Sequence, residues 1–188
     1  PVPYVLEVYV IGGGGVGATW FYAYGGGAAG QYLTGTVTEP PAGLAYTVYI
    51  GGGSSAQNAN YSQGATGGWT YFYRSSGGST LELYAAGGGG GNIQSATSAG
   101  AGGGGGGGGR GNSAWDGLVH SNGYYGGDGN VGGAYNGGGG AGTGGDGVDA
   151  GNVELVGAAG GAGYAWLDGV TRGGGGGGAT AKRRFGVS

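Results

Sequence analysis

AGAGGGGGGGGRG, residues 99–111, contains eight consecutive glycines, Gly102 to Gly109. A glycine run has no side chain to bury and loses the most backbone entropy on ordering, so in water it is by default a flexible linker. The alternative is an extended, left-handed threefold helix of the polyproline II type, which has no internal hydrogen bonds. Such a helix needs several others packed beside it, because buried backbone N–H and C=O groups are nearly always paired.

Further glycine runs recur along the whole chain, separated by short segments rich in aromatic and β-branched residues. They occupy residues 12–15, 25–30, 51–53, 87–91, 137–151, 157–163 and 173–178. This recurrence favours a lattice of glycine helices over a set of linkers. Glycine supplies 62 of 188 residues, but a strict G-X-Y phase is absent and there are only 4 prolines, which excludes collagen.

Composition limits the classes of function. Charged residues make up only 8 % of the chain and the net charge is −3, so no nucleic-acid partner is expected. Cysteine is absent, which excludes disulfides and cysteine-based zinc sites, and no apolar run is long enough for membrane insertion. Because the chain opens at Pro1 and has no methionine, we expect a mature or excised fragment.

Alternating apolar segments predict short strands. Residues 4–11 form a first strand with Leu6, Val8 and Val10 on one face, and residues 18–24 are a second apolar run. Residues 31–50 predict a hairpin around the turn PPAG, residues 69–85 a second hairpin, and residues 153–156, 164–167 and 179–185 short closing strands. No segment has a sustained 3.6-residue period. We therefore expect an all-β, partly irregular fold with essentially no α-helix.

The length suits one compact domain with two regions. Residues 1–86 form a β-rich part with glycine blocks. Residues 87–188 form a polyglycine-rich lattice with loop islands and the short closing strands.

Catalysis has little support in the sequence. There is one histidine, His120, and a Ser-His-Asp site would need it to act with Asp116 in a loop without nucleophile geometry. Residues 144–149 match the start of a calcium-binding nonapeptide repeat, but only once, whereas calcium β-rolls need tandem copies. We expect no enzyme, no metal site and no cofactor.

Aromatic residues in the islands between glycine runs are the better candidates for function. Residues 112–125 form the largest island in the second half and are predicted to protrude. The candidate binding residues there and nearby are Trp115, Asp116, His120, Asn122, Tyr124, Tyr125 and Tyr135. Exposed tyrosine and tryptophan supply rigid contact area at low entropy cost. The alternative, that these aromatics are lids packed over the glycine helices, stays open for each residue. The aromatics of residues 20–24 and 69–73 are expected to be core and strand-face residues.

The order of segments resembles a known family. Residues 25–53 consist of a glycine block, a predicted hairpin and a second glycine block. Residues 69–91, WTYFYRSSGGSTLELYAAGGGGG, place an aromatic strand, a turn and an apolar strand before a glycine run. From about residue 4 to about residue 178, the chain resembles the glycine-rich domain of tailed-phage tail-fibre proteins and adhesins, and is similar to the glycine-rich ectodomain of anaplastic lymphoma kinase. The absence of cysteine favours the phage or bacterial branch.

The resemblance implies a small β-sandwich-like body beside a bundle of polyglycine II helices with protruding aromatic loops. It also implies a function: the receptor-binding tip of a phage tail fibre, located on the virion or otherwise outside the cell. The partners implied are a host-surface receptor, either an outer-membrane protein or a glycan, other tail-fibre chains and a homo-oligomer. A structural subunit of an extracellular filament or coat is the alternative, because strands with little charge are ready to assemble. An ice-binding surface fits less well, since large aromatic islands would spoil its flatness.

Overall fold

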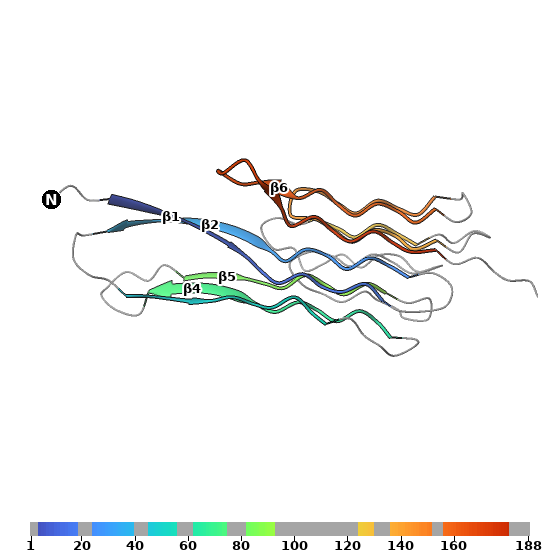
Figure 1. Cartoon of the computed structure of the whole chain (residues 1–188), viewed down its shortest axis with the longest axis horizontal. Helices are drawn as coiled ribbons and strands as arrows, with labels where there is room; N and C mark the ends of the chain where they lie inside the picture. The colour runs from blue at the N-terminus through green and yellow to red at the C-terminus, as the bar shows by residue number, and fades with distance from the viewer. Residues whose placement is uncertain are drawn as a thin grey trace, which may run out of the picture.

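A computed structural model describes residues 4–18, 24–39, 45–55, 62–74, 82–92, 124–129, 136–151 and 156–180. These residues contain no helix, and their strands form small antiparallel sheets, so the predicted all-β, irregular fold class is confirmed. Figure 1 shows an elongated molecule in which strands β1 to β5 gather at one end and undulating glycine segments fill the other.

The first sheet pairs β1 (Tyr4–Ile11) with β2 (Tyr32–Glu39) in antiparallel register, with Ile11 opposite Tyr32. The predicted first strand is confirmed. Its alternation places Val8 and Val10 in the buried core, whereas Val5 is 60 % exposed on the other face.

The second sheet has the order β3-β4-β5, built from β3 (Tyr46–Tyr49), β4 (Thr70–Arg74) and β5 (Glu82–Ala85). The antiparallel pairing of β4 with β5 confirms the predicted second hairpin. The predicted hairpin over residues 31–50 is wrong, because β2 pairs with β1 and β3 pairs with β4. The strands on the two sides of PPAG thus belong to different sheets. Two strands pair where the glycine segments that adjoin them also bond to each other.

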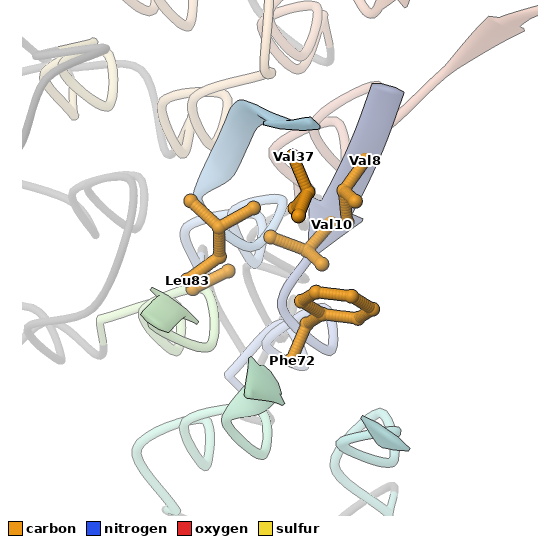
Figure 2. Close-up of a cluster of buried hydrophobic side chains, with 6 residues drawn as sticks. Val8, Val10, Val37, Phe72 and Leu83 are labelled. Atoms are coloured by element: carbon orange, nitrogen blue, oxygen red, sulfur yellow. The ribbon is translucent and has the colours of Figure 1, made fainter. Parts of the chain in front are cut away.

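A small apolar core lies between the two sheets (Figure 2). Its buried members are Val8, Val10, Val37, Phe72, Leu83 and Ala85, with Leu6, Leu33 and Tyr46 packed against them. The core draws on β1, β2, β4 and β5, which makes this end of the molecule a two-layer arrangement. Beyond it, side-chain packing gives way to backbone hydrogen bonding.

Strands and glycine segments form continuous ladders. The first sheet ends where Ile11 lies opposite Tyr32. Beyond this pair, Gly12 donates to the Gln31 carbonyl at 2.9 Å and Gly15 donates to the Ala28 carbonyl at 2.8 Å. These two bonds continue the register of the sheet. Past β4 and β5, Gly67 likewise donates to the Gly88 carbonyl at 2.9 Å. The glycine segments are therefore extensions of the strand pairs.

Within the glycine segments the hydrogen bonds repeat every three residues, as in polyglycine packed in threefold helices. In the segment 25–31, the N–H groups of residues 25, 28 and 31 donate to the segment 86–92. Those of residues 26 and 29 donate to the segment 137–142. The segment also accepts bonds from the segments 12–18 and 173–178. The described runs are thus hydrogen-bonded to one another, in keeping with the lattice interpretation, and these bonds join residues on both sides of position 86.

The last part of the chain adds a third layer to the bundle. A short hairpin of β6 (Tyr164–Ala165) and β7 (Thr171–Arg172) connects two glycine segments, 156–163 and 173–178, that bond to each other. Figure 1 shows these segments lying along the bundle, with β6 toward the strand end. Ala179 pairs with Tyr24, and Thr180 pairs with Asn136, in isolated β-bridges. Outside the described residues lie 19–23, 93–123 with the run Gly102 to Gly109, 152–155 and 181–188.

Candidate binding site

The outer face of the sheet β3-β4-β5 is a surface of aromatic rings. Alternation along β4 directs Phe72 into the core and leaves Tyr71 and Tyr73 on the opposite face, where Tyr49 and Tyr84 flank them on the neighbouring strands. Trp69, which precedes β4, contacts Tyr84 with ring centroids 4.6 Å apart. We call these five residues the aromatic face.

Stacking between neighbouring rings holds the aromatic face in place. Tyr71 stacks on Tyr49 with centroids 5.0 Å apart and 9° between planes, and on Tyr84 with centroids 5.9 Å apart and 11° between planes. Such cross-strand pairs stabilise a sheet while fixing each ring in place. Even so, Tyr49 and Tyr84 are each 53 % exposed and Trp69 is 48 % exposed. The outcome is a stiff array of rings open to solvent.

A shallow hollow of about 320 Å³ opens on this sheet, lined by Tyr71, Phe72, Tyr73, Leu83 and Tyr84. None of these five residues is acidic or basic, and the three tyrosines each end in a phenol hydroxyl. The hollow therefore suits a neutral ligand that offers apolar surface and hydroxyl or amide groups.

A second group of aromatic rings is covered by the β6–β7 hairpin and does not form an open surface. Tyr9 and Tyr32 lie on the face of β1 and β2 away from the core, and the β6–β7 hairpin covers them with Tyr164 and Trp166. The Tyr32 ring lies 5.0 Å from that of Tyr164 and 5.8 Å from that of Trp166. Burial raises the pKa of Tyr32, with a further contribution from Tyr164. This cluster fixes the hairpin to the first sheet.

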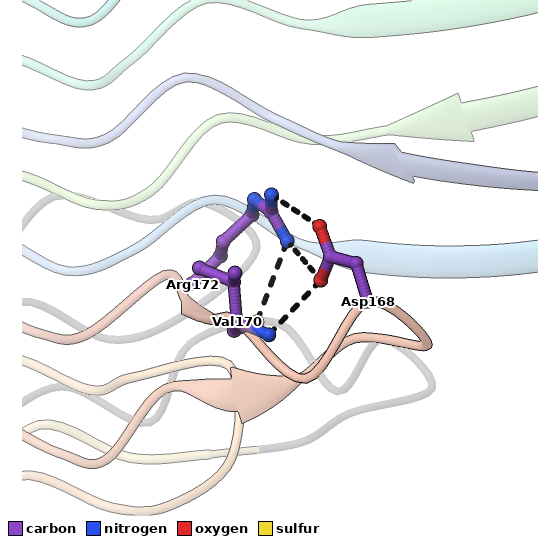
Figure 3. A network of polar contacts seen from close by, with 3 residues as sticks. All are labelled: Asp168, Val170 and Arg172. Atoms are coloured by element: carbon purple, nitrogen blue, oxygen red, sulfur yellow. Dashed lines mark hydrogen bonds and ion pairs between the residues drawn. The ribbon is translucent and has the colours of Figure 1, made fainter.

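The tip of the hairpin is braced by an ion pair (Figure 3). The Arg172 guanidinium donates to both carboxylate oxygens of Asp168, at 2.8 and 2.7 Å, and the Val170 N–H donates to the same carboxylate at 3.0 Å. Arg172 also lies over the Trp166 ring, 4.7 Å from its centroid. These hydrogen bonds, led by that from Arg172, lower the pKa of Asp168 from 3.8 to about 2.

This pKa predicts an acid-sensitive hairpin. Because the folded pKa lies below the unfolded value, the stabilisation by Asp168 is complete above about pH 4 and is lost as the pH falls toward 2. The melting temperature of wild type should fall more over this range than that of Asp168→Asn, which has no carboxylate to protonate. The effect should be small, since the pair is exposed. Parallel melting curves for the two proteins between pH 5 and pH 2 would rule it out.

Of the binding residues predicted from sequence, the structure describes Tyr124 and Tyr125. Trp115, Asp116, His120, Asn122 and Tyr135 lie outside the described residues. Tyr125 is 39 % exposed, and its backbone is held in the lattice because its N–H donates to the Asp146 carboxylate at 2.7 Å and its carbonyl accepts from Gly147. Tyr124 is partly exposed. The binding role of the island therefore stays a prediction.

The carboxylates of the calcium-like match have a structural role. Asp146 accepts from the Tyr125 N–H, and Asp149 accepts from the Asp128 N–H at 2.7 Å. Each carboxylate therefore ties residues 125–128 to the loop after residue 144. Within the described ranges, no three His, Cys, Asp or Glu side chains gather where they could hold a metal ion.

The aromatic face was not predicted as a site. Sequence alternation separates Tyr71 and Tyr73 from Phe72, but it does not tell which face of the strand a second layer covers. The only available signal was that one face carries tyrosines and tryptophan while the other carries Phe72 and Leu83, which have no polar atoms.

Comparison with known proteins gives one match. The model of a family described as a glycine-rich domain matches residues 3–187. No curated protein and no solved structure matches the chain. In the part of the chain that the structure describes, no helix is long and apolar enough to cross a membrane.

Proposed function

The chain belongs to the glycine-rich domain family, and we propose that it is an attachment module, the receptor-binding tip of a phage tail fibre. In this proposal the glycine lattice is a stiff scaffold, and exposed aromatic side chains contact a receptor on the host surface. Binding requires no catalytic chemistry of the chain.

The observation that carries the proposal is the aromatic face. Aromatic residues dominate binding hot spots, and an exposed apolar patch on a folded domain usually marks an interaction surface. The stacking of Tyr71 against Tyr49 and Tyr84 holds the rings before a partner arrives, which lowers the entropy lost on binding. The uncharged lining of the hollow favours a neutral receptor surface, such as a glycan or an uncharged protein loop.

A double substitution tests this role. Trp69→Ala with Tyr84→Ala should reduce binding of the labelled chain to receptor-bearing bacterial cells by at least about thirtyfold, the effect of losing roughly 2 kcal/mol at a hot spot. Both side chains are about half exposed, so the fold should survive. Leu167→Ala, which removes a side chain that is 76 % exposed on the hairpin, is the matched control and should bind normally.

The same assay separates the aromatic face from the island predicted from sequence. If Trp115→Ala and Tyr124→Ala abolish binding and the double variant does not, the contact surface is the island. If neither pair changes binding of a folded protein, aromatic attachment is wrong.

A second candidate function is a structural subunit of an extracellular filament, and the edge strand β3 favours it. β3 pairs only with β4 among the described strands, and Val48 and Ile50 at this edge are 56 % and 79 % exposed. An uncharged, apolar edge can pair with the same edge of another copy. Electron microscopy of the purified chain distinguishes the candidates: discrete particles support the tip, and indefinite polymers that Val48→Lys dissolves support the filament.

A further inference from the structure

The hydroxyl groups of the aromatic face are not used by the described chain. Four of the five residues of this face are tyrosines, and no hydrogen bond of the described residues uses the hydroxyl of Tyr49, Tyr71, Tyr73 or Tyr84. The Tyr9 hydroxyl, by contrast, donates to the Glu7 carboxylate at 3.0 Å. A phenol hydroxyl can both donate and accept a hydrogen bond. The face therefore offers a ligand several neutral hydrogen-bonding groups on rings that are already held in place.

The row of stacked rings ends in an open ring on each side. Tyr71 lies between Tyr49 and Tyr84, so its two ring faces are occupied. Among the described rings, Tyr49 at one end contacts only Tyr71, and Trp69 at the other end contacts only Tyr84. Both terminal rings are about half exposed. The face of an aromatic ring is electron-rich and attracts weakly positive C–H groups, such as those on the flat side of a sugar ring.

The size and charge of the hollow favour part of a neutral chain molecule. Its volume of about 320 Å³ is near the lower limit for small-molecule sites, and its five lining residues are far fewer than the roughly 20–30 that a stable protein interface uses on each side. No lining residue is basic, Glu82 lies opposite Tyr73 in the strand register, and the chain has a net charge of −3. An acidic ligand is therefore disfavoured.

A row of neutral polar residues continues from the aromatic face along the bundle. The segment 62–68 adjoins β4, and its hydrogen bonds connect it to neighbouring glycine segments of the lattice. Gln63, Thr66 and Trp69 are exposed, at intervals of three residues. In a threefold helix such residues lie on one side, roughly 9 Å apart. The hydroxyl and amide groups of this row therefore extend the uncharged surface beyond the Trp69 ring.

We propose that the aromatic face binds a neutral glycan chain, with sugar rings in the hollow and over Trp69 and further sugars along Thr66 and Gln63. A sugar combines C–H surface with many hydroxyl groups, which matches open ring faces beside phenol hydroxyls that the described chain does not use. A chain of sugars also matches a contact surface that is long and narrow. This inference rests on the proposed attachment function and specifies the chemistry of the receptor.

The probe is the polysaccharide released from receptor-bearing cells, separated into neutral and acidic fractions. The neutral fraction should bind the full chain saturably, and the acidic fraction should not. Trp69→Ala should lower the affinity for the neutral fraction at least about tenfold, as expected for loss of an aromatic anchor. Tyr73→Phe keeps the ring and should lower this affinity about three- to tenfold, because one neutral hydrogen bond is lost.

Two further variants make the test specific. Tyr9→Phe removes a tyrosine hydroxyl outside the aromatic face and is the matched control for Tyr73→Phe, so it should leave glycan affinity unchanged. Thr66→Val keeps the shape of the side chain and removes its hydroxyl. It should weaken binding of long fragments of the neutral polysaccharide but not of its disaccharides. Melting temperatures check that each variant is folded.

Treatment of the cells separates this inference from the proposed function. Periodate, which cleaves the vicinal diols of sugars, should abolish binding of the chain to the cells, whereas protease treatment of the same cells should not. If protease abolishes binding and periodate does not, the chain is still an attachment module, but its receptor is a protein and the glycan inference is overturned. A chain that binds no untreated cells would overturn the attachment function itself.

Two results with the isolated polysaccharide would also overturn the inference. The first is a chain that attaches to cells and does not bind their neutral fraction. The second is binding of the neutral fraction that folded Trp69→Ala and Tyr73→Phe chains leave unchanged.

Discussion

Gly88→Ala is expected to lower the free energy of unfolding by about 3 kcal/mol or more. A Cβ at this position would overlap the carbonyl oxygens of Ala28 and Ala29 in the adjacent segment. The residue is buried, and its own N–H donates to the Gly13 carbonyl at 2.8 Å, so moving it away breaks lattice hydrogen bonds. Thermal melting should show a fall of roughly 6–12 °C, since 1 kcal/mol corresponds to about 2–4 °C in a chain of this size.

Gly52→Ala is the matched control for Gly88→Ala. Its Cβ meets nothing within 4 Å, and alanine reduces the freedom of the unfolded chain, so stability should stay the same or rise slightly. Equal melting temperatures for Gly88→Ala and Gly52→Ala would mean that the glycine segments are not packed as a lattice.

Trp166→Ala is expected to release the β6–β7 hairpin from the first sheet. The indole packs 6.1 Å from the Tyr9 ring and 5.8 Å from the Tyr32 ring, and it is the surface under the Arg172 guanidinium. Because the side chain is only partly buried, we expect a loss of about 2 kcal/mol, less than for a fully buried tryptophan. A lower melting temperature and greater exposure of Tyr9 and Tyr32 to solvent would show it.

Trp166→Phe tests the cause of this loss. The Trp166 indole nitrogen is buried without a hydrogen-bond partner among the described residues, so phenylalanine keeps a ring and removes an unsatisfied donor. This variant should be close to wild type in stability. If Trp166→Phe is as unstable as Trp166→Ala, ring packing does not hold the hairpin.

The sequence pattern predicted those strands and turns that depend only on residues near one another in the sequence. The strand Tyr4–Ile11 follows from alternation, and the aromatic hairpin follows from two such runs around a glycine-containing turn. Long-range pairing was harder to predict. Tyr32–Glu39 and Tyr46–Tyr49 are close in sequence, yet they enter different sheets because glycine segments that carry no side-chain signature determine which strands meet.

The candidate site was missed for a related reason. Which face of β4 is covered depends on where β1 and β2 lie, and these are positioned by contacts far away in sequence. Similarly, Tyr9 and Tyr32 are covered only because the hairpin of residues 164–172 returns to them along the glycine segments 156–163 and 173–178. Because the glycine runs are nearly identical in sequence, the sequence does not indicate which runs lie side by side in the lattice.

The unbroken register between strands and glycine segments restricts how this protein can change in length. Removing one residue from the segment 12–18 would turn every later N–H by a third of a revolution, away from its present neighbour. Removing three residues from that segment and three from 25–31, with which it pairs antiparallel, would restore every direction and shorten the bundle there by roughly 9 Å. Insertions and deletions in these runs should therefore be tolerated in multiples of three, with matched changes in the paired run.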